Sequence, residues 1–137
     1  MNNQELLSLA EKYQSPLYVY EGAVIETQYQ RISTAFQHVK NLKLNYAVKA
    51  NSNLSILKLF HKLNSGIYTV SIQEVQLGLL AGFDPSDIIF TPNGVSLQEL
   101  EEVANLGVQI NIDNISILEQ FGHHYPEIPV CIRINPH

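Results

Sequence analysis

Cysteine, tryptophan and basic side chains are all scarce in this chain of 137 residues. It holds one cysteine and no tryptophan, and eight lysines and arginines stand against thirteen aspartates and glutamates, for a formal net charge of −5. A single cysteine excludes a disulfide framework and is typical of a reducing compartment. Because the few basic residues form no stripe, we expect no nucleic-acid partner.

Long apolar runs are missing as well. No stretch approaches the roughly 18 residues of a membrane span, so we expect no membrane partner. Residues 1–10 lack the basic segment that opens a secretory signal, which together with the lone cysteine predicts a cytoplasmic protein. His123 and His124 have no suitably spaced carboxylate or cysteine beside them, so no metal site is expected.

What the sequence does contain is an alternation of strand and helix patterns. Its hydrophobic content of 45% is that of a globular protein. The first helix is expected over residues 6–13, and serine–glutamate capping boxes mark later helices that begin at Ser71 and Ser96. The last helix is expected to stop at Gly122. Strands are expected at residues 17–20, 44–48, 67–70, 88–91, 108–112 and 130–134.

Repeated strand–helix units predict a parallel sheet, either a doubly wound open sheet or a (β/α)8 barrel. The strand near residue 110 distinguishes them, because positions 108, 110 and 112 are apolar whereas 109, 111 and 113 are polar. A sheet covered by helices on both faces is apolar on both, whereas a barrel with a ligand site in its mouth tolerates polar inner positions. We therefore predict an α/β fold, a partial TIM-type (β/α)8 barrel with about five parallel strands.

Two basic residues fall on the polar face of this expected sheet. Lys49 ends the first parallel strand, on the face that carries Asn45 and Ala47. A lysine in this place suits Schiff-base chemistry, although periodicity alone also permits a lysine that simply reaches into solvent. Arg133 has the same inward parity on the last strand, and is either a second site residue or one half of a surface ion pair.

Six short motifs follow one another along nearly the whole chain, at residues 16–20, 46–51, 70–74, 81–83, 111–113 and 133–136. Through them the sequence resembles the N-terminal part of the diaminopimelate decarboxylases, which are pyridoxal-phosphate enzymes with a barrel of the alanine racemase type. The last motif, Arg-Ile-Asn-Pro, is usually lacking in ornithine and arginine decarboxylases, which share the barrel and the lysine. It separates the decarboxylase branches only in part.

The resemblance implies pyridoxal 5′-phosphate as the cofactor, with Lys49 as the catalytic, cofactor-binding lysine and Arg133 as a second cofactor-binding residue. It also implies decarboxylation of the amino acid meso-2,6-diaminopimelate to L-lysine by a homodimer. Residues 1–22 would be an N-terminal helix and strand that in relatives pairs with a C-terminal β domain, and residues 23–137 the first part of the barrel. Other groups that relatives use to hold the cofactor lie further along their chains, so residues 1–137 alone are expected to be inactive.

Position 68 departs from the pattern of the resembling family. Relatives usually carry Gly-x-Asp-x-Val-Ser, whereas this chain has Tyr68 in place of the aspartate. A carboxylate close to the cofactor would be lost. This departure leaves open a non-catalytic relative that binds pyridoxal phosphate or regulates. A decarboxylase of ornithine or arginine also stays open, because those enzymes share the barrel and the lysine.

Overall fold

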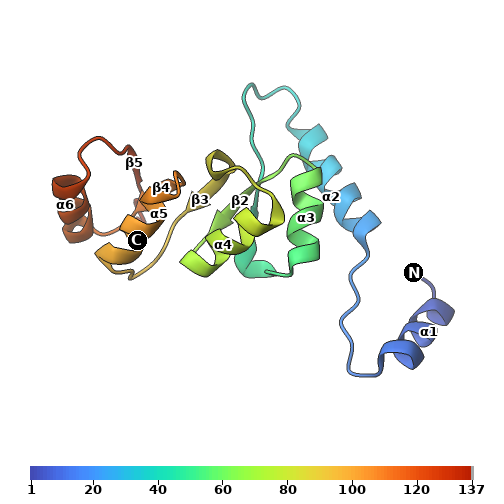
Figure 1. Ribbon diagram of the computed structural model, residues 1–137. Helices are drawn as coiled ribbons and strands as arrows, with labels where there is room; N and C mark the ends of the chain where they lie inside the picture. Colours follow the sequence, from blue (N-terminus) through green and yellow to red (C-terminus); the bar gives the residue numbers. More distant parts are fainter. Residues whose placement is uncertain (137) are drawn as a thin grey trace. The chain divides into compact units, whose positions relative to one another are not determined.

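The computed structural model describes residues 1–136, and the chain divides into two compact units, residues 1–38 and residues 39–137. The first unit holds two helices, α1 (Asn3–Tyr13) and α2 (Gly22–Ala35), joined by an extended segment (Figure 1). α1 begins earlier than expected because Asn2 caps it. The Asn2 side chain accepts a hydrogen bond from the Glu5 backbone at 2.9 Å, and the Glu5 carboxylate accepts one from the Asn2 backbone at 2.7 Å.

The strand expected at residues 17–20 is not formed. These residues are extended but pair with no other strand, and Tyr18 is 87% exposed. A strand needs a hydrogen-bonded neighbour, which the local sequence cannot supply. Glu21, the residue that follows this segment, is tied to the start of the chain, because its carboxylate lies 2.8 Å from the N-terminal amine of Met1.

The second unit is built on one sheet of five parallel strands, which lie side by side in chain order (Figure 1). The strands are β1 (Asn45–Ala47), β2 (Gly66–Thr69), β3 (Ile88–Phe90), β4 (Gln109–Ile112) and β5 (Val130–Ile132). Between successive strands run α3 (Leu54–Lys62), α4 (Ile72–Ala81), α5 (Leu97–Asn105) and α6 (Ile115–His124), with short 3-10 turns at η1 (Val48–Ala50) and η2 (Pro85–Asp87). The predicted partial barrel of five parallel strands is confirmed. β1 and β5 are its edges.

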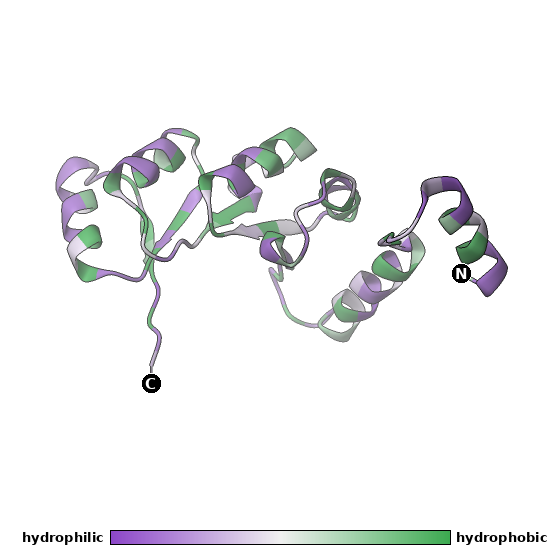
Figure 2. Cartoon of the chain, turned by 90° about the horizontal axis from the view of Figure 1, so that it is seen from below, coloured by the Kyte–Doolittle hydropathy of each residue, from purple (hydrophilic) through white to green (hydrophobic). Residues whose placement is uncertain are grey.

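The core lies between one face of this sheet and the four helices. Figure 2 shows these helices carrying both hydrophilic and hydrophobic residues, as amphipathic helices on a sheet do. Gly78 lets α4 approach the sheet closely, since a Cβ there would collide with Cδ1 of Ile67. The largest fully buried side chains are Phe90, Phe121, Leu57, Ile67, Ile88, Leu100 and Ile110.

Helix ends follow the sequence signals closely, with two corrections. The capping box at Ser96 and Glu99 forms as predicted, but at the other one the Glu74 carboxylate accepts from the backbone of Val70 at 2.8 Å, one residue before the cap. α6 does not stop at Gly122 but continues to His124. Gly122 keeps helical backbone there, because a glycine ends a helix only where the chain turns into the left-handed conformation.

Candidate cofactor site

Strand register places a row of side chains on the sheet face opposite the core. Ala47 of β1 pairs with Tyr68 of β2, which pairs with Ile89 of β3, which pairs with Gln109 of β4. Register partners in neighbouring parallel strands point to the same side of the sheet. We call this side the open face; its strand residues are Asn45, Ala47, Gly66, Tyr68, Ile89, Gln109, Asn111 and Cys131.

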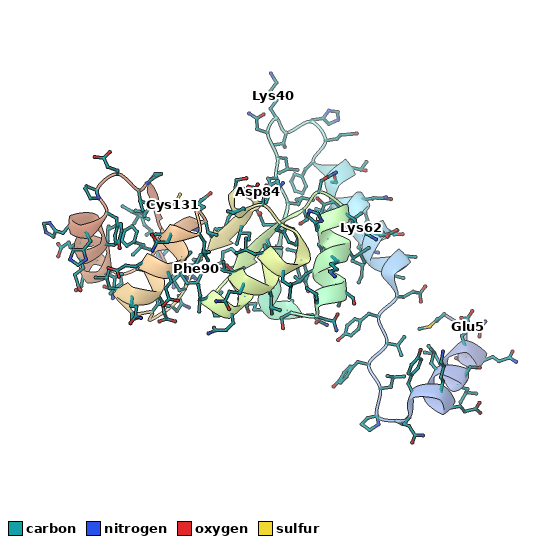
Figure 3. The ribbon with its side chains drawn as sticks, viewed as in Figure 1. Glu5, Lys40, Lys62, Asp84, Phe90 and Cys131 are labelled. Atoms are coloured by element: carbon teal, nitrogen blue, oxygen red, sulfur yellow. The ribbon has the colours of Figure 1, made fainter. Side chains whose placement is uncertain are left out.

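The open face carries the polar residues that the strand alternation predicted. Asn111 donates from Nδ2 to Oγ1 of Thr91, just beyond β3, at 2.9 Å. Gln109 Nε2 lies 3.5 Å from Oδ1 of Asn111 and 3.4 Å from Sγ of Cys131. Cys131 is labelled on β5 in Figure 3. These contacts join the carboxyl end of β3 to β4 and β5.

Lys49 lies at the carboxyl end of β1, but in the 3-10 turn η1 rather than on the strand itself. The strand ends at Ala47, Val48 is fully buried, and Lys49 is exposed. The Tyr46 hydroxyl closes this turn by donating to the backbone oxygen of Asn51 at 3.0 Å. The Tyr46 ring is held in turn by Phe60 of α3, with ring centroids 3.9 Å apart. The motif at residues 46–51 thus forms a turn that is held by side-chain contacts and exposes one lysine.

The ammonium group of Lys49 has no hydrogen-bond or ion-pair partner among residues 1–136. Lys43, by contrast, is paired to Asp87 at 2.9 Å. No carboxylate of the described chain therefore occupies the Lys49 amine, which is placed for reaction with a carbonyl group.

Arg133 comes directly after β5, one residue beyond the strand on which we expected it. Its backbone N–H donates to the oxygen of Ile112 at 2.8 Å, and its guanidinium donates from Nη1 to Oδ1 of Asn93 at 3.3 Å. It forms no ion pair within the described part of the chain, so the surface salt bridge that we considered for it is not seen there. Asn93 carried no role in the sequence interpretation, because nothing local marks a contact across 40 residues.

Lys49 and Arg133 lie at the same end of the sheet but at opposite edges. Four strand spacings of about 4.8 Å separate β1 from β5, so the structure does not bring the two side chains into contact. A hollow of about 280 Å³ borders Arg133, between α6 and the residues that follow β5. A second one of about 280 Å³ lies between the loops after β3 and β4. Neither is lined by Lys49.

Comparison with known proteins gives a consistent result. Residues 23–137 match the family model of the pyridoxal binding domain of pyridoxal-dependent decarboxylases. The chain is 37% identical over 134 residues to the diaminopimelate decarboxylase of Methanothermobacter thermautotrophicus, covering 96% of this chain and 31% of the relative. It is 34% identical over 136 residues to that of Pseudomonas aeruginosa, covering 96% of this chain and 32% of the relative.

Solved structures agree with this result. Diaminopimelate decarboxylase from Helicobacter pylori, complexed with L-lysine, superposes with a TM-score of 0.84 at 34% identity, covering 98% of this chain and 34% of that one. A lysine/ornithine decarboxylase from Vibrio vulnificus superposes with a TM-score of 0.85 at 20% identity, covering 96% of this chain and 36% of that one. This second likeness shows the fold alone.

Five parallel strands, of which β1 to β4 lead into helices, carry an unpaired amine at their carboxyl end and define part of a barrel suited to a carbonyl cofactor. The chain belongs to the pyridoxal-dependent decarboxylases and forms part of their pyridoxal binding domain. It spans about a third of the length of the curated relatives that it matches. The family resemblance expected from the motifs is thereby confirmed, as is a pyridoxal cofactor.

The described residues fit the chemistry of pyridoxal phosphate, which is an aldehyde with anionic groups. Lys49 offers an amine without an acidic partner, and Arg133 offers a cation without a counter-charge. The strand residues of the open face are otherwise uncharged. Residues 1–136 contain no group of three or more His, Cys, Asp or Glu side chains gathered as metal ligands. None of their helices is both long and apolar enough to cross a membrane.

Proposed function

We propose that the full-length protein containing this chain is a decarboxylase that converts meso-2,6-diaminopimelate to L-lysine, with Lys49 as its Schiff-base residue. The observation that supports it most is the unpaired Lys49 amine, presented by a turn that Tyr46 closes. Relatives named diaminopimelate decarboxylase cover nearly all of this chain. The Helicobacter pylori relative was solved with L-lysine, the product in our proposal.

Pyridoxal phosphate, when bound, supplies an electron sink for the electron pair that remains on the α-carbon after the carboxylate leaves. Lys49 would hold the cofactor through its amine, both before a substrate binds and after the product leaves. Arg133 would hold an anionic oxygen of the cofactor by a charge-assisted hydrogen bond.

The proposal also covers the location of the protein in the cell, its domains and its oligomeric state. An exposed Cys131 whose thiol forms no disulfide in the described chain is compatible with a reducing cytoplasm. The exposed, extended residues 17–20 suit our proposal that residues 1–22 pair with a C-terminal β domain, and residues 23–137 then form the first part of the barrel. A homodimer is proposed from the family resemblance.

Tyr68 favours a second candidate, a relative that binds pyridoxal phosphate without decarboxylating. Tyr68 lies on the open face as the register partner of Ala47. Ala47 comes two residues before Lys49 in the sequence. Where relatives usually carry an acid, this chain has a phenol. Cofactor binding needs the amine of Lys49, but the second candidate would lack the local charge used in turnover.

Both candidates are tested with the purified full-length protein and pyridoxal phosphate. We expect CO2 and L-lysine from meso-2,6-diaminopimelate, and little CO2 from ornithine or arginine. Borohydride reduction followed by peptide mapping should place the phosphopyridoxyl group on Lys49. Lys49→Ala should lose label and turnover, whereas Lys58→Ala, an exposed lysine on α3, should keep both.

Other results would change the assignment. If CO2 were released only from ornithine or arginine, the protein would still be a decarboxylase, but its proposed substrate would be wrong. Label on Lys49 without CO2 from any of the three amino acids would establish the non-catalytic candidate. Label on another lysine would remove Lys49 from its proposed role.

A further inference from the structure

A series of polar contacts crosses the open face from β5 to the end of β3 and returns to the residue directly after β5. From Cys131 on β5 it passes through Gln109 and Asn111 on β4 to Thr91 after β3. Two residues further along, Asn93 accepts a hydrogen bond from Arg133, which lies two residues beyond Cys131. The guanidinium of Arg133 therefore reaches back across β4 to the loop that follows β3.

The loop that carries Asn93 is anchored at its root. The backbone N–H of Thr91 donates to the oxygen of Thr69 at 2.9 Å, and its hydroxyl accepts from Asn111. Thr91 and Pro92 are both buried. Gly94 then turns the chain with a φ of +66°, which leaves Asn93 exposed at the start of the turn. An otherwise exposed amide is thus fixed in place by the buried residues before it.

This contact orients the guanidinium of Arg133 without neutralising its charge. An asparagine oxygen accepts one hydrogen bond from the guanidinium but carries no charge. Arg133 has no carboxylate within ion-pair distance among residues 1–136, although Asp113 borders the same hollow. A carboxylate in the place of Asn93 would hold the guanidinium equally well, but would take up its charge.

We propose that Asn93 is a positioning residue for Arg133. It fixes the guanidinium at the carboxyl end of β3 to β5 and leaves the positive charge free for an anionic oxygen of the cofactor. This inference rests on the proposed function, in which Arg133 contacts pyridoxal phosphate. It adds a residue that touches neither cofactor nor substrate and acts only through Arg133.

The test measures the dissociation constant of pyridoxal phosphate for the full-length apoprotein, by fluorescence titration. We expect Asn93→Ala to weaken binding roughly threefold to tenfold, as for the loss of one ordinary hydrogen bond, since this contact is long and exposed. Asn93→Asp should weaken it at least as much, since the new carboxylate competes with the cofactor for Arg133. On the background of Arg133→Ala, Asn93→Ala should have no further effect. Asn105→Ala, an exposed asparagine at the end of α5, is the matched control and should bind as the parent does.

A full additional loss from Asn93→Ala on the Arg133→Ala background would overturn the inference, because Asn93 would then act independently of Arg133. Unchanged binding in Asn93→Ala, or in Arg133→Ala itself, would overturn it too. If circular dichroism shows that Asn93→Ala folds poorly, the dissociation constants of Asn93→Ser and Asn93→Asp are compared with that of the parent instead. CO2 release by the parent protein is measured separately, so failure of the decarboxylase assignment is distinguished from failure of the Asn93–Arg133 coupling.

Discussion

Ala47 on β1 and Tyr68 on β2 are register partners in two parallel strands, so a phenol stands beside the strand that leads directly into Lys49. Along β1, β2 and β3 the open face carries no carboxylate at all; its residues there are Asn45, Ala47, Gly66, Tyr68 and Ile89. The electrostatic surroundings of Lys49 on this part of the sheet are therefore neutral. A single substitution can test whether these neutral surroundings affect the binding of pyridoxal phosphate.

Tyr68→Asp in the full-length protein places a negative charge beside the strand that carries Lys49. A carboxylate favours the protonated form of a nearby amine, and only the neutral amine attacks an aldehyde. We expect the pH at which pyridoxal phosphate binding is half-maximal to move upward, by up to about one pH unit. The measurement is cofactor absorbance against pH. Tyr68→Asn is the control, because asparagine is close in size to aspartate but uncharged. An equal shift in that variant would show that charge is not the cause.

The positions of the strands and helices could be predicted because their signals are local. Ser96 and Glu99 cap α5 as the motif indicates, and Gly82 ends α4 with a left-handed φ of 105°. The alternation of polar and apolar residues also identified the open face, since it follows from strand geometry alone. In these places the local preference and the final fold agree.

Where the sequence failed, a distant or competing contact decides the structure. Residues 17–20 have strand composition but no neighbouring strand in the described chain. α6 passes through Gly122, and the Tyr125 backbone donates to the oxygen of Phe121 at 2.8 Å while their rings stack. The contact between Arg133 and Asn93 joins residues 40 apart, which no periodicity reveals.

Gly78 and Gly122 are both helical glycines, yet alanine should affect them in opposite directions. A Cβ at Gly78 would collide with Cδ1 of Ile67 and would lie 3.3 Å from Cδ1 of Ile88, whereas nothing lies within 4 Å of one at Gly122. We expect Gly78→Ala to lower the free energy of unfolding by up to about 2 kcal/mol, because an overpacking cost of roughly 1–3 kcal/mol exceeds a gain in helix propensity of about 1 kcal/mol. Gly122→Ala should raise it by up to about 1 kcal/mol through helix propensity. Urea unfolding of both variants checks this, and a stabilised Gly78→Ala would contradict the close packing of α4 on β2.

Asp84 offers a prediction about pH. The Ser86 hydroxyl, at 2.6 Å, and then the Ser86 backbone N–H, at 2.9 Å, donate to its carboxylate and hold the pKa of Asp84 below its ordinary value of 3.8. Because the pKa is lower in the folded state, the contribution to stability is present above pH 3.8 and is lost as the pH falls through the folded pKa. We expect Ser86→Ala to raise the pKa of Asp84 toward 3.8, as measured by NMR titration of its carboxyl carbon. The exposed Ser33→Ala should leave that titration unchanged, and an unaltered curve in Ser86→Ala would remove the hydroxyl as the cause.

Residues 1–137 alone should release no CO2 from meso-2,6-diaminopimelate beyond the rate of free pyridoxal phosphate. Lys49 and Arg133 lie at the two edges of the sheet, and neither β1 nor β5 has a second neighbouring strand among the described residues. Reacting groups must be held in a fixed mutual geometry, which an open sheet does not provide. Beyond β4, Ile132 and Ile134 are 65% and 81% exposed, so self-association is expected instead.

The measurement supplies residues 1–137 with excess cofactor and follows CO2, with size-exclusion chromatography to report association. The full-length protein is the positive control, and Lys49→Ala in residues 1–137 reports the background of free cofactor. Release above that background, abolished by Lys49→Ala, would show that one third of the length of the relatives already contains a working site. In that case the two edges of the sheet would have to meet around the cofactor, and the separation of Lys49 from Arg133 could not be what limits this chain.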